Sequence, residues 1–394
     1  MKKSMSVLLA AAMCSAMLAG CGSTAADTAA DASAETTAAA ATEAADSSAS
    51  AEGVNVFKIG GTSPLTGAAA IYGNAVKNGA QIAVDEINEA GGINGMQVEF
   101  KFEDDEHDAE KSVNAYNSLK DWGMQMLMGT VTSTPCTAVV EKTHEDNMFQ
   151  LTPSGSAVES IKYDNAFRVC FSDPGQGTAS AKYIGENKLA SKVAVIYNSS
   201  DVYSSGIYQK FAEEAKNQDF EVVSAEAFTE DSKTDFSVQL QKAKDAGADM
   251  VFLPIYYQEA SVILKQANDK DFHPQFFGCD GMDGILSVDG FDKSLAEGLM
   301  LLTPFSVDEE SSQDFVTAYR DAYDGVYAIK AAAEKAEITP DMSASDICDA
   351  LKTAMTEIQI DGLTGTEMHW TAEGEPQKAP KAVEIKDGKY EMMQ

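Results

Sequence analysis

The sequence lacks the motifs that mark the common catalytic and metal sites. Its 394 residues include only four histidines, which show no HExxH-like spacing. There is no GxSxG turn, no GxxxxGK phosphate loop and no GxGxxG. The six cysteines form no CxxC pair, which disfavours a zinc site. Because no catalytic set is visible, we predict a protein that is not an enzyme and that carries neither a metal nor a cofactor.

Positive charge is also scarce. Against 62 acidic residues the chain has 29 basic ones, so its formal charge is −33, and loss of Lys2 and Lys3 with a signal peptide would take it to −35. This balance argues against a nucleic-acid partner and against broad binding to anionic lipid. The acidic segment 103–108 lacks the EF-hand pattern, and we interpret it as a solvated loop. The composition fits a soluble exported protein.

The first residues read as an export signal of the lipoprotein type. Residues 1–20 begin with Lys2 and Lys3 and hold an apolar run from 5 to 18 that is too short to stay in a bilayer. Leu-Ala-Gly-Cys at 18–21 resembles the bacterial lipobox, in which Cys21 becomes the lipid-bearing first residue. An ordinary signal peptide that happens to hold a cysteine is the alternative.

A low-complexity segment follows the signal. Residues 21–53 comprise the lipidated cysteine and a stretch of almost only Ala, Thr, Ser, Asp and Glu, without an aromatic residue. Such a stretch cannot bury enough surface to fold, so we predict a disordered tether with a reach on the order of 30 Å. An Ala-rich helix is the competing interpretation. The remaining cysteines are expected to be small buried residues: Cys136, Cys170, Cys279 and Cys348.

From residue 54 onward, strand and helix patterns alternate in two series. In the first, strands at 54–60, 96–102, 126–128 and 148–151 enclose helices near 75–87 and 109–122. In the second, strands at 193–197, 221–225, 250–255 and 275–278 enclose helices near 208–217, 236–246 and 259–268. Strands that alternate with helices predict parallel sheets covered by helices. The fold class is therefore α/β, with two Rossmann-like lobes joined by a hinge of several crossings.

We assign the segments of the chain to the lobes as follows. The N-terminal lobe takes 54–172 plus 304–362, and the C-terminal lobe takes 173–303 plus 363–394. Two lobes joined by more than one crossing would form a cleft between their ligand loops. That arrangement suits a bilobal binding protein or a two-domain enzyme.

Two short strands of the first series run into hydroxyl-rich loops. In MQMLMGTVTSTPC, Thr134 is expected to cap a helix that begins at Pro135, and in LTPSGSAVE, Ser156 is expected to cap a helix and pair with Glu159. In a parallel sheet both helix starts would open at one edge and offer backbone N–H groups to an anion. The stretch predicts a carboxylate site.

The second series offers groups that suit an ammonium. Asp280 follows the strand at 275–278, at the edge where ligand loops form, and a buried acid gains strong hydrogen bonds to a cation. Tyr203 and Tyr256 lie in loops and could stack on a ligand, although ordinary core or rim tyrosines are the alternative. Together the two lobes suit an amino-acid zwitterion.

With these segments in place, the chain resembles the branched-chain amino-acid-binding proteins of bacterial ABC transporters, of the leucine-isoleucine-valine-binding type. The likeness runs from about Val54 to Tyr390. Its marks are GTSPLTGAAAIYGNAVKNGAQIAVDEINEAGGING, MGTVTSTPC, LTPSGS, RVCFSDPGQGTASAKYI and FFGCDG. The resemblance implies the type I periplasmic binding protein fold.

The resemblance also implies roles for single residues. Ser133 takes the place of the serine that holds the ligand carboxylate, the carbonyl of Ser154 would meet the ammonium, and Ser156 would contact both groups. Asp280 takes the place of the ammonium-binding carboxylate, which is a longer glutamate in some members. The remaining positions match second-lobe tyrosines and side-chain pocket residues: Tyr203, Tyr256, Tyr72 and Val131.

The chain departs from this family pattern at two places. Compared with the family pattern, about ten residues are absent before the helical segment that contains Arg320, so the resemblance does not assign this part of the pocket wall. Thr132 and the loop at 104–108 lack the cysteines that some relatives bridge.

We therefore expect a lipoprotein that binds an amino acid, branched-chain or another apolar one, and delivers it to the permease subunits of an ABC importer. It would lie on the outer face of the cytoplasmic membrane or in the periplasm, held through Cys21, as a monomer. A sensor for amino acids or amides is one alternative, although the chain has no output domain. A surface-anchored hydrolase is another, and it would need a nucleophile and a base in the cleft.

Overall fold

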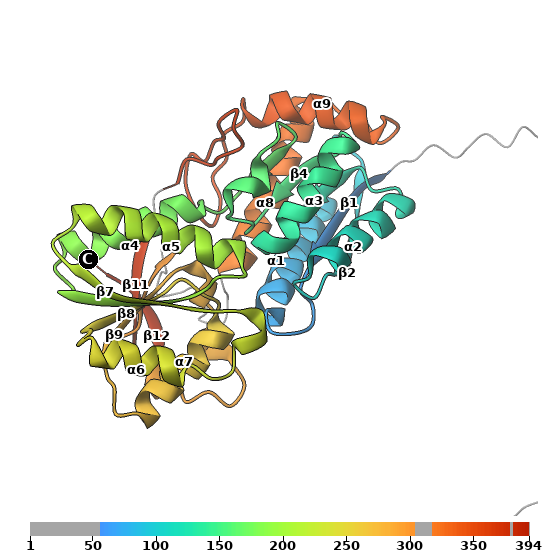
Figure 1. Ribbon diagram of the computed structural model, residues 1–394. Coiled ribbons are helices and arrows are strands. Elements are labelled where there is room, and N and C mark those ends of the chain that lie inside the picture. Colours follow the sequence, from blue (N-terminus) through green and yellow to red (C-terminus); the bar gives the residue numbers. More distant parts are fainter. Residues whose placement is uncertain (1–55, 304–316, 379–380, 394) are drawn as a thin grey trace, which may run out of the picture. The chain divides into compact units, whose positions relative to one another are not determined.

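The computed structural model describes residues 56–303, 317–378 and 381–393. The chain from Glu52 onward forms one compact unit. In its described part, a five-stranded and a seven-stranded sheet each carry helices on both faces (Figure 1). The predicted α/β class is thereby confirmed. The predicted signal, Cys21 and the tether lie outside the described residues.

The first sheet is entirely parallel, in the order β2-β1-β3-β4-β5. Its strands are β1 (Val56–Ser63), β2 (Gln97–Asp104), β3 (Met126–Met128), β4 (Phe149–Thr152) and β5 (Ala166–Arg168). Side chains alternate between its faces. Met126 and Met128 pack in one apolar core with α1 (Ala70–Glu89) and α8 (Thr317–Lys335), whereas Leu127 packs with α2 (Ala109–Trp122) and α3 (Ser133–Glu145). Helix α9 (Ala344–Met355) packs against β4.

The second sheet has the order β12-β11-β10-β9-β8-β6-β7. It is parallel from β7 to β10 and antiparallel across β10, β11 and β12. Its strands are β6 (Lys192–Asn198), β7 (Glu221–Phe228), β8 (Met250–Leu253), β9 (Gln275–Gly278), β10 (Met300–Thr303), β11 (Lys381–Lys386) and β12 (Lys389–Met392). Helices α4 (Asp173–Glu186) and α5 (Val202–Glu214) cover one face, and α6 (Ser237–Asp245) and α7 (Tyr257–Asp269) cover the other (Figure 1).

Two predicted helix starts are wrong. Helix α3 begins at Ser133 with Thr132 at the N-cap, two residues before the expected start, because the hydroxyl of Thr134 donates to Asp201 Oδ1 at 3.0 Å instead of capping. After β4 there is only a single 3-10 turn, Val158–Ile161, whose N-cap is Ala157. Ser156 does not form a capping box, because its hydroxyl lies 3.4 Å from that of Ser133.

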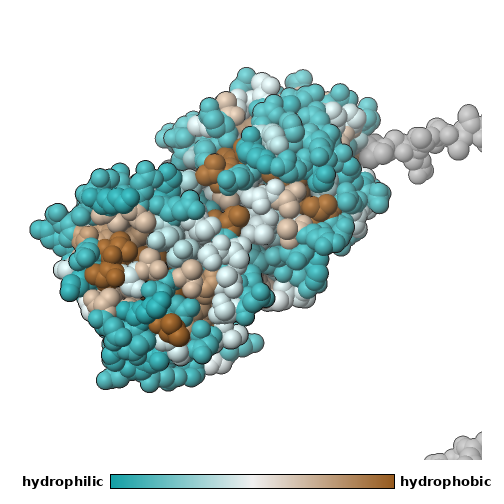
Figure 2. All heavy atoms as spheres, viewed as in Figure 1, coloured by the Kyte–Doolittle hydropathy of each residue, from teal (hydrophilic) through white to brown (hydrophobic). Residues whose placement is uncertain are grey.

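The cysteines are buried, and few large apolar side chains are exposed among the described residues. Within the described residues the four cysteines from Cys136 to Cys348 are buried and free, as predicted. The exposed large apolar residues of the described part are Ile82, Val158, Val202, Val238 and Leu363, and the visible face is mainly hydrophilic (Figure 2). None of the described helices combines the length and apolar character that a membrane crossing needs.

Candidate functional site

The ends of β3 and β4 bring two serine hydroxyls together. Ser133, the first residue of α3, accepts a hydrogen bond from the backbone N–H of Ala157 at 3.2 Å, and its Oγ lies 3.4 Å from that of Ser156. Both serines are buried. At the start of a helix the N–H groups of Ser133 and Thr134 have no partner within the helix. Hydroxyls beside such N–H groups, at the positive end of the helix dipole, suit a carboxylate.

Asp280 opens a 3-10 turn just after β9, in the second sheet. The hydroxyl of Tyr203 donates to Asp280 Oδ1 at 2.9 Å and accepts the N–H of Gly281 at 2.9 Å. Burial raises the pKa of Asp280 to about 7, although hydrogen bonds from Tyr203 and Gln176 act against the rise. Near neutral pH the carboxyl is therefore balanced between its two forms, and a cation beside it would favour the ionised one.

Tyr72 links the hydroxyl loops of the first sheet to Asp280. Its hydroxyl donates to the backbone oxygen of Asp280 at 3.4 Å, and a hydrogen bond with the side chain of Ser154 lowers its pKa against the larger raising effect of burial. The Tyr72 ring meets that of Tyr256 edge-on at 6.5 Å, and Tyr256 stacks on Tyr203 at 4.8 Å. The structure thus brings these five predicted residues into one cluster.

Val131 and Tyr72 belong to the same apolar core cluster. Val131 is fully buried in the loop between β3 and α3. This position beside the hydroxyl-rich loop is compatible with a residue that lines the ligand pocket. Its contact with the ligand side chain stays a prediction.

Two further hydrogen bonds join elements of the first sheet to elements of the second. Thr134 donates to Asp201 across 67 residues of sequence at 3.0 Å, and the backbone N–H of Ile71 donates to Tyr257 Oη at 3.1 Å. Burial raises the pKa of Asp201, whereas nearby His107 and the Thr134 hydroxyl lower it. Helix starts of both lobes therefore meet around the tyrosine cluster.

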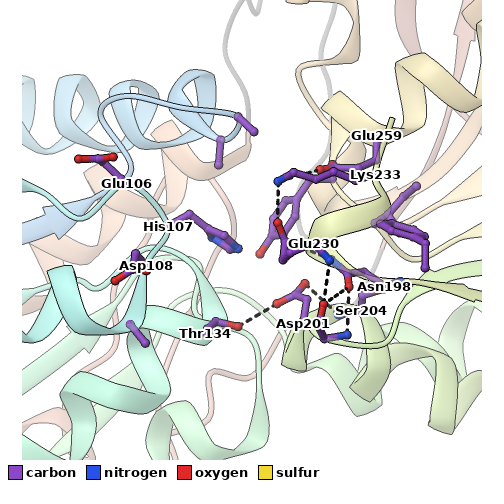
Figure 3. Close-up of a pocket in the computed structure, with 17 residues that line it drawn as sticks. Glu106, His107, Asp108, Thr134, Asn198, Asp201, Ser204, Glu230, Lys233 and Glu259 are labelled. Atoms are coloured by element: carbon purple, nitrogen blue, oxygen red, sulfur yellow. Dashed lines mark hydrogen bonds and ion pairs between the residues drawn. The ribbon is translucent and has the colours of Figure 1, made fainter. Parts of the chain in front are cut away.

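A cavity of about 420 Å³ adjoins this cluster and shares Tyr256 with it. Figure 3 shows His107 and Thr134 on one wall and Asp201, Glu230 and Lys233 on the other. His107 Nδ1 lies 2.9 Å from Thr132 Oγ1, and its ring meets Tyr256 edge-on at 5.5 Å. A polar cavity beside a buried aromatic cluster is suited to the entry of a small polar ligand.

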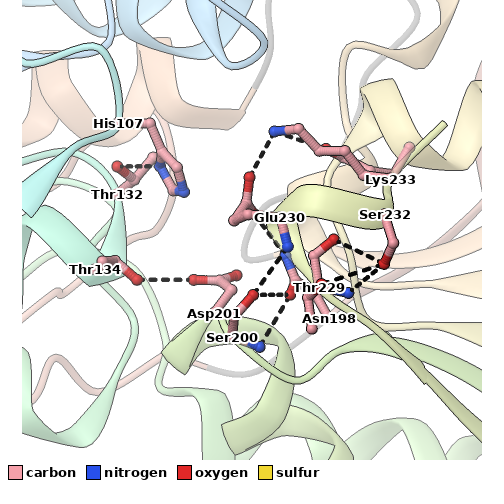
Figure 4. Close-up of polar contacts among 11 residues, drawn as sticks. His107, Thr132, Thr134, Asn198, Ser200, Asp201, Thr229, Glu230, Ser232 and Lys233 are labelled. Carbon is pink, nitrogen blue, oxygen red and sulfur yellow. Dashed lines mark hydrogen bonds and ion pairs between the residues drawn. The ribbon is translucent and has the colours of Figure 1, made fainter.

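Three charged residues of this cavity form a network with one another. Lys233 Nζ lies 2.6 Å from Glu230 Oε2 and 3.8 Å from Glu259 Oε1. Asn198 donates to Glu230 at 2.6 Å, and Ser200 donates to Asn198 Oδ1 at 2.8 Å (Figure 4). The network fixes the β7–α6 connection to the loop after β6. Lys233 thus lies between two glutamates at one edge of the cavity.

Sequence reasoning missed several residues of this region. His107, Asp201 and Lys233 lie in loops or at a helix cap, where no periodic signal marks them. Asp173 and Gln176, at the start of α4, lie beside Ser156 and Asp280, although their SDPGQG segment carries no sequence signal besides the family resemblance. Among the described residues no group of three or more His, Cys, Asp or Glu side chains is placed to hold a metal ion.

The chain was compared with known proteins. The family model described as "Periplasmic binding protein" matches residues 56–389. The Leu/Ile/Val-binding protein homolog 3 of Brucella melitensis biotype 1 is 30% identical over 302 residues, which cover 73% of this chain and 81% of that protein. The Leu/Ile/Val-binding protein BraC3 of Rhizobium johnstonii is 30% identical over 308 residues, which cover 75% and 83%.

A solved structure of a protein of the same kind also resembles this chain. The branched-chain amino acid transporter substrate binding protein LivJ of Streptococcus pneumoniae, in complex with isoleucine, is 27% identical in sequence. It superposes with a TM-score of 0.76 over 86% of this chain and 99% of its own. The chain therefore belongs to the periplasmic binding protein family and is a homologue of the Leu/Ile/Val-binding proteins.

Proposed function

We propose that this protein is the extracytoplasmic substrate-binding component of an ABC importer and that it binds an amino acid, branched-chain or another apolar one. One observation carries the proposal: Tyr72 hydrogen-bonds with the side chain of Ser154 and with the backbone oxygen of Asp280. It thereby links the loop of Ser156, whose buried hydroxyl lies 3.4 Å from that of Ser133, to the turn that carries the buried Asp280 carboxyl. The names of the relatives and the isoleucine bound to LivJ support this ligand class.

The site divides the zwitterion between the lobes. Ser133, Ser156 and the free N–H groups of α3 would hold the carboxylate, while Asp280 and the carbonyl of Ser154 would hold the ammonium. Apolar and aromatic groups would surround the ligand side chain: Tyr72, Val131, Tyr203 and Tyr256. A polar ligand enters such a buried site without loss only when each charge finds a partner.

Closure of the two lobes would be a shift of population toward the ligand-bound form. A ligand held by α3 and by the Asp280 turn contacts both lobes, so it stabilises the form in which they are together. The hydrogen bonds of Thr134 to Asp201 and of Tyr72 to Asp280 add to that form. The permease subunits would then recognise the closed protein.

The anchor is a separate part of the proposal. The lipobox-like sequence supports a lipid on Cys21 and a location on the outer face of the cytoplasmic membrane or in the periplasm. We propose further that the protein is a monomer. We expect Cys21→Ala to move the protein from the membrane fraction to the soluble fraction, because an acyl chain supplies the membrane affinity. A variant that stays with the membrane shows that the anchor is misread.

The test of function is a thermal-shift screen over the twenty amino acids and their amides, followed by titration calorimetry. A ligand present at 100 times its Kd adds about 2.7 kcal/mol to the unfolding free energy, which such a screen detects easily. Recovery of the ligand unchanged after incubation agrees with binding, whereas a chemically altered ligand favours the hydrolase. No response to any amino acid contradicts the proposal.

A further inference from the structure

Asp173 is a buried acid whose carboxyl makes no hydrogen bond of normal geometry with the described residues. It is the first residue of α4 and is 1% exposed. Its backbone N–H donates to the carbonyl of Ser156 at 2.9 Å, which places it directly behind the hydroxyl loop. A buried polar group without a partner lowers stability, so its presence calls for a role.

The first turn of α4 faces Asp280. Gln176 lies three residues after Asp173 and hence on the same side of the helix. Its Oε1 accepts the backbone N–H of Asp280 at 3.3 Å, while its buried Nε2 makes no hydrogen bond of normal geometry with the described residues, although the Gln176 side chain is near enough to Asp280 to lower the pKa of that carboxyl. The first turn of α4 therefore places the Asp173 carboxyl and the Gln176 amide near the predicted ammonium site, and both can make further hydrogen bonds there.

Within the described residues, Asp173 forms no ion pair. Burial raises its pKa; the nearby Ser156 hydroxyl and Arg168 lower it, and the carboxyls of Asp280 and Asp201 raise it. The contacts of Arg168 are with other groups: its Nη1 donates to the carbonyls of Gly155, at 3.3 Å, and Ser156, its Nε lies 3.3 Å from Glu375, and its Nη2 makes no hydrogen bond with the described residues. Asp173 and Asp280 are both buried and their charges disfavour each other, so a cation beside both would offset that repulsion.

We propose that Asp173 binds the ligand ammonium together with Asp280. This inference rests on the proposed function. An ammonium has three N–H donors, and two carboxylates and the Ser154 carbonyl offer three acceptors. A carboxylic acid that lacks the ammonium would leave both acids unpaired in a buried site. The pair therefore selects zwitterions and rejects simple carboxylic acids of the same shape.

The inference is tested with Asp173→Asn and two probes, L-leucine and 4-methylpentanoate, which is leucine without its ammonium. By titration calorimetry at pH 8, we expect the variant to bind L-leucine roughly 10- to 100-fold more weakly, as for one lost hydrogen bond to a charged group. Its affinity for 4-methylpentanoate should stay unchanged or increase, because a repelling carboxylate is removed.

Asp105→Asn is the matched control. Asp105 is another buried acid with an unpartnered oxygen and a pKa raised by burial to about 7, but its charged neighbours are Asp104 and Asp108. This variant should leave both affinities unchanged.

The same titrations in two buffers of different ionisation enthalpy report the number of protons released when the ligand binds. The Asp173→Asn protein should release fewer protons than the wild type.

Stability separates this role from a structural one. The ligand-free Asp173→Asn protein should melt at the same temperature as the wild type or higher, because an unpartnered buried acid is removed. Equal weakening of both probes, or a lower melting temperature with unchanged L-leucine affinity, overturns the inference alone. A wild-type protein that binds no amino acid overturns the proposed function and this inference with it.

Discussion

Replacement of Asp280 by Asn removes the charge that the ligand ammonium requires but keeps the shape of the side chain. Asp280 is 2% exposed, so an ammonium beside it has no water to replace the lost partner. Removal of one partner from a buried ion pair costs about 3–5 kcal/mol, and about 1.4 kcal/mol corresponds to a factor of ten. We therefore expect the Kd for L-leucine to rise roughly 100- to 4,000-fold at pH 8.

The raised pKa of Asp280 adds a pH dependence with a defined sign. With a pKa of about 7 in the ligand-free protein, the carboxyl is protonated below neutral pH and must lose that proton to bind an ammonium. Affinity should therefore fall by up to about tenfold for each pH unit below 7 and level off above it. Because the folded protein holds the proton more tightly than the unfolded chain, Asp280 destabilises the ligand-free protein as pH rises toward 7.

Titration calorimetry between pH 5.5 and 8.5 checks both expectations. The wild type should bind L-leucine more tightly as pH increases, and Asp280→Asn should lose this part of the dependence. The ligand-free Asp280→Asn protein should also be the more stable one at pH 8. Asp105→Asn, which changes a buried acid of similar pKa outside the cluster, should bind L-leucine with the affinity and the pH dependence of the wild type. An Asp280→Asn affinity within threefold of the wild type at pH 8 would refute the reasoning.

Three further changes test other parts of the site. Ser133→Ala should weaken L-leucine and 4-methylpentanoate alike, roughly tenfold, because both carry the carboxylate; calorimetry that shows a loss for one probe only contradicts this role. Thr134→Val removes a hydrogen bond between the lobes and should speed ligand release about fivefold in stopped-flow tyrosine fluorescence; an unchanged rate counts against closure through this contact. Lys378→Met leaves the buried Asp321 without its cation and should lower the unfolding free energy, measured in urea at pH 8, by about 3–5 kcal/mol. As a control, Lys265→Met removes an exposed partner and should change the unfolding free energy by less than about 1 kcal/mol. Equal effects of the two changes would contradict the argument from burial.

The layered fold could be predicted because its elements carry strong periodic patterns. The segments 109–122, 126–128 and 275–278 have the predicted bounds, since apolar spacing and flanking turn residues agree there. The rule that ligand loops form at the carboxyl ends of parallel strands then placed Ser133, Ser156 and Asp280 near one another. Their roles toward a ligand stay predictions.

The caps and the rest of the site could not be predicted, for physical reasons. TVTSTP offers hydroxyl groups at 130, 132, 133 and 134, and the choice among them depends on Asp201, which is distant in sequence. Asp173 lies in Ser-Asp-Pro-Gly, which also suits a solvated turn, and only packing against the Ser156 loop buries it. The Glu230–Lys233 pair belongs to a connection without periodicity, so the sequence gives no sign that it faces His107.

The antiparallel end of the second sheet affects how this protein must be synthesised and folded. Strand β10 pairs with β9 on one side and with β11 on the other, yet β11 and β12 come after α8 and α9, which pack on the other lobe. Until residues 381–393 have emerged, the buried Met-Leu-Leu-Thr segment of β10 is an open edge that another chain could join. A nascent chain that stalls before residue 381 should therefore need protection from aggregation, and the C-terminal ribbon acts as the final closure of the lobe.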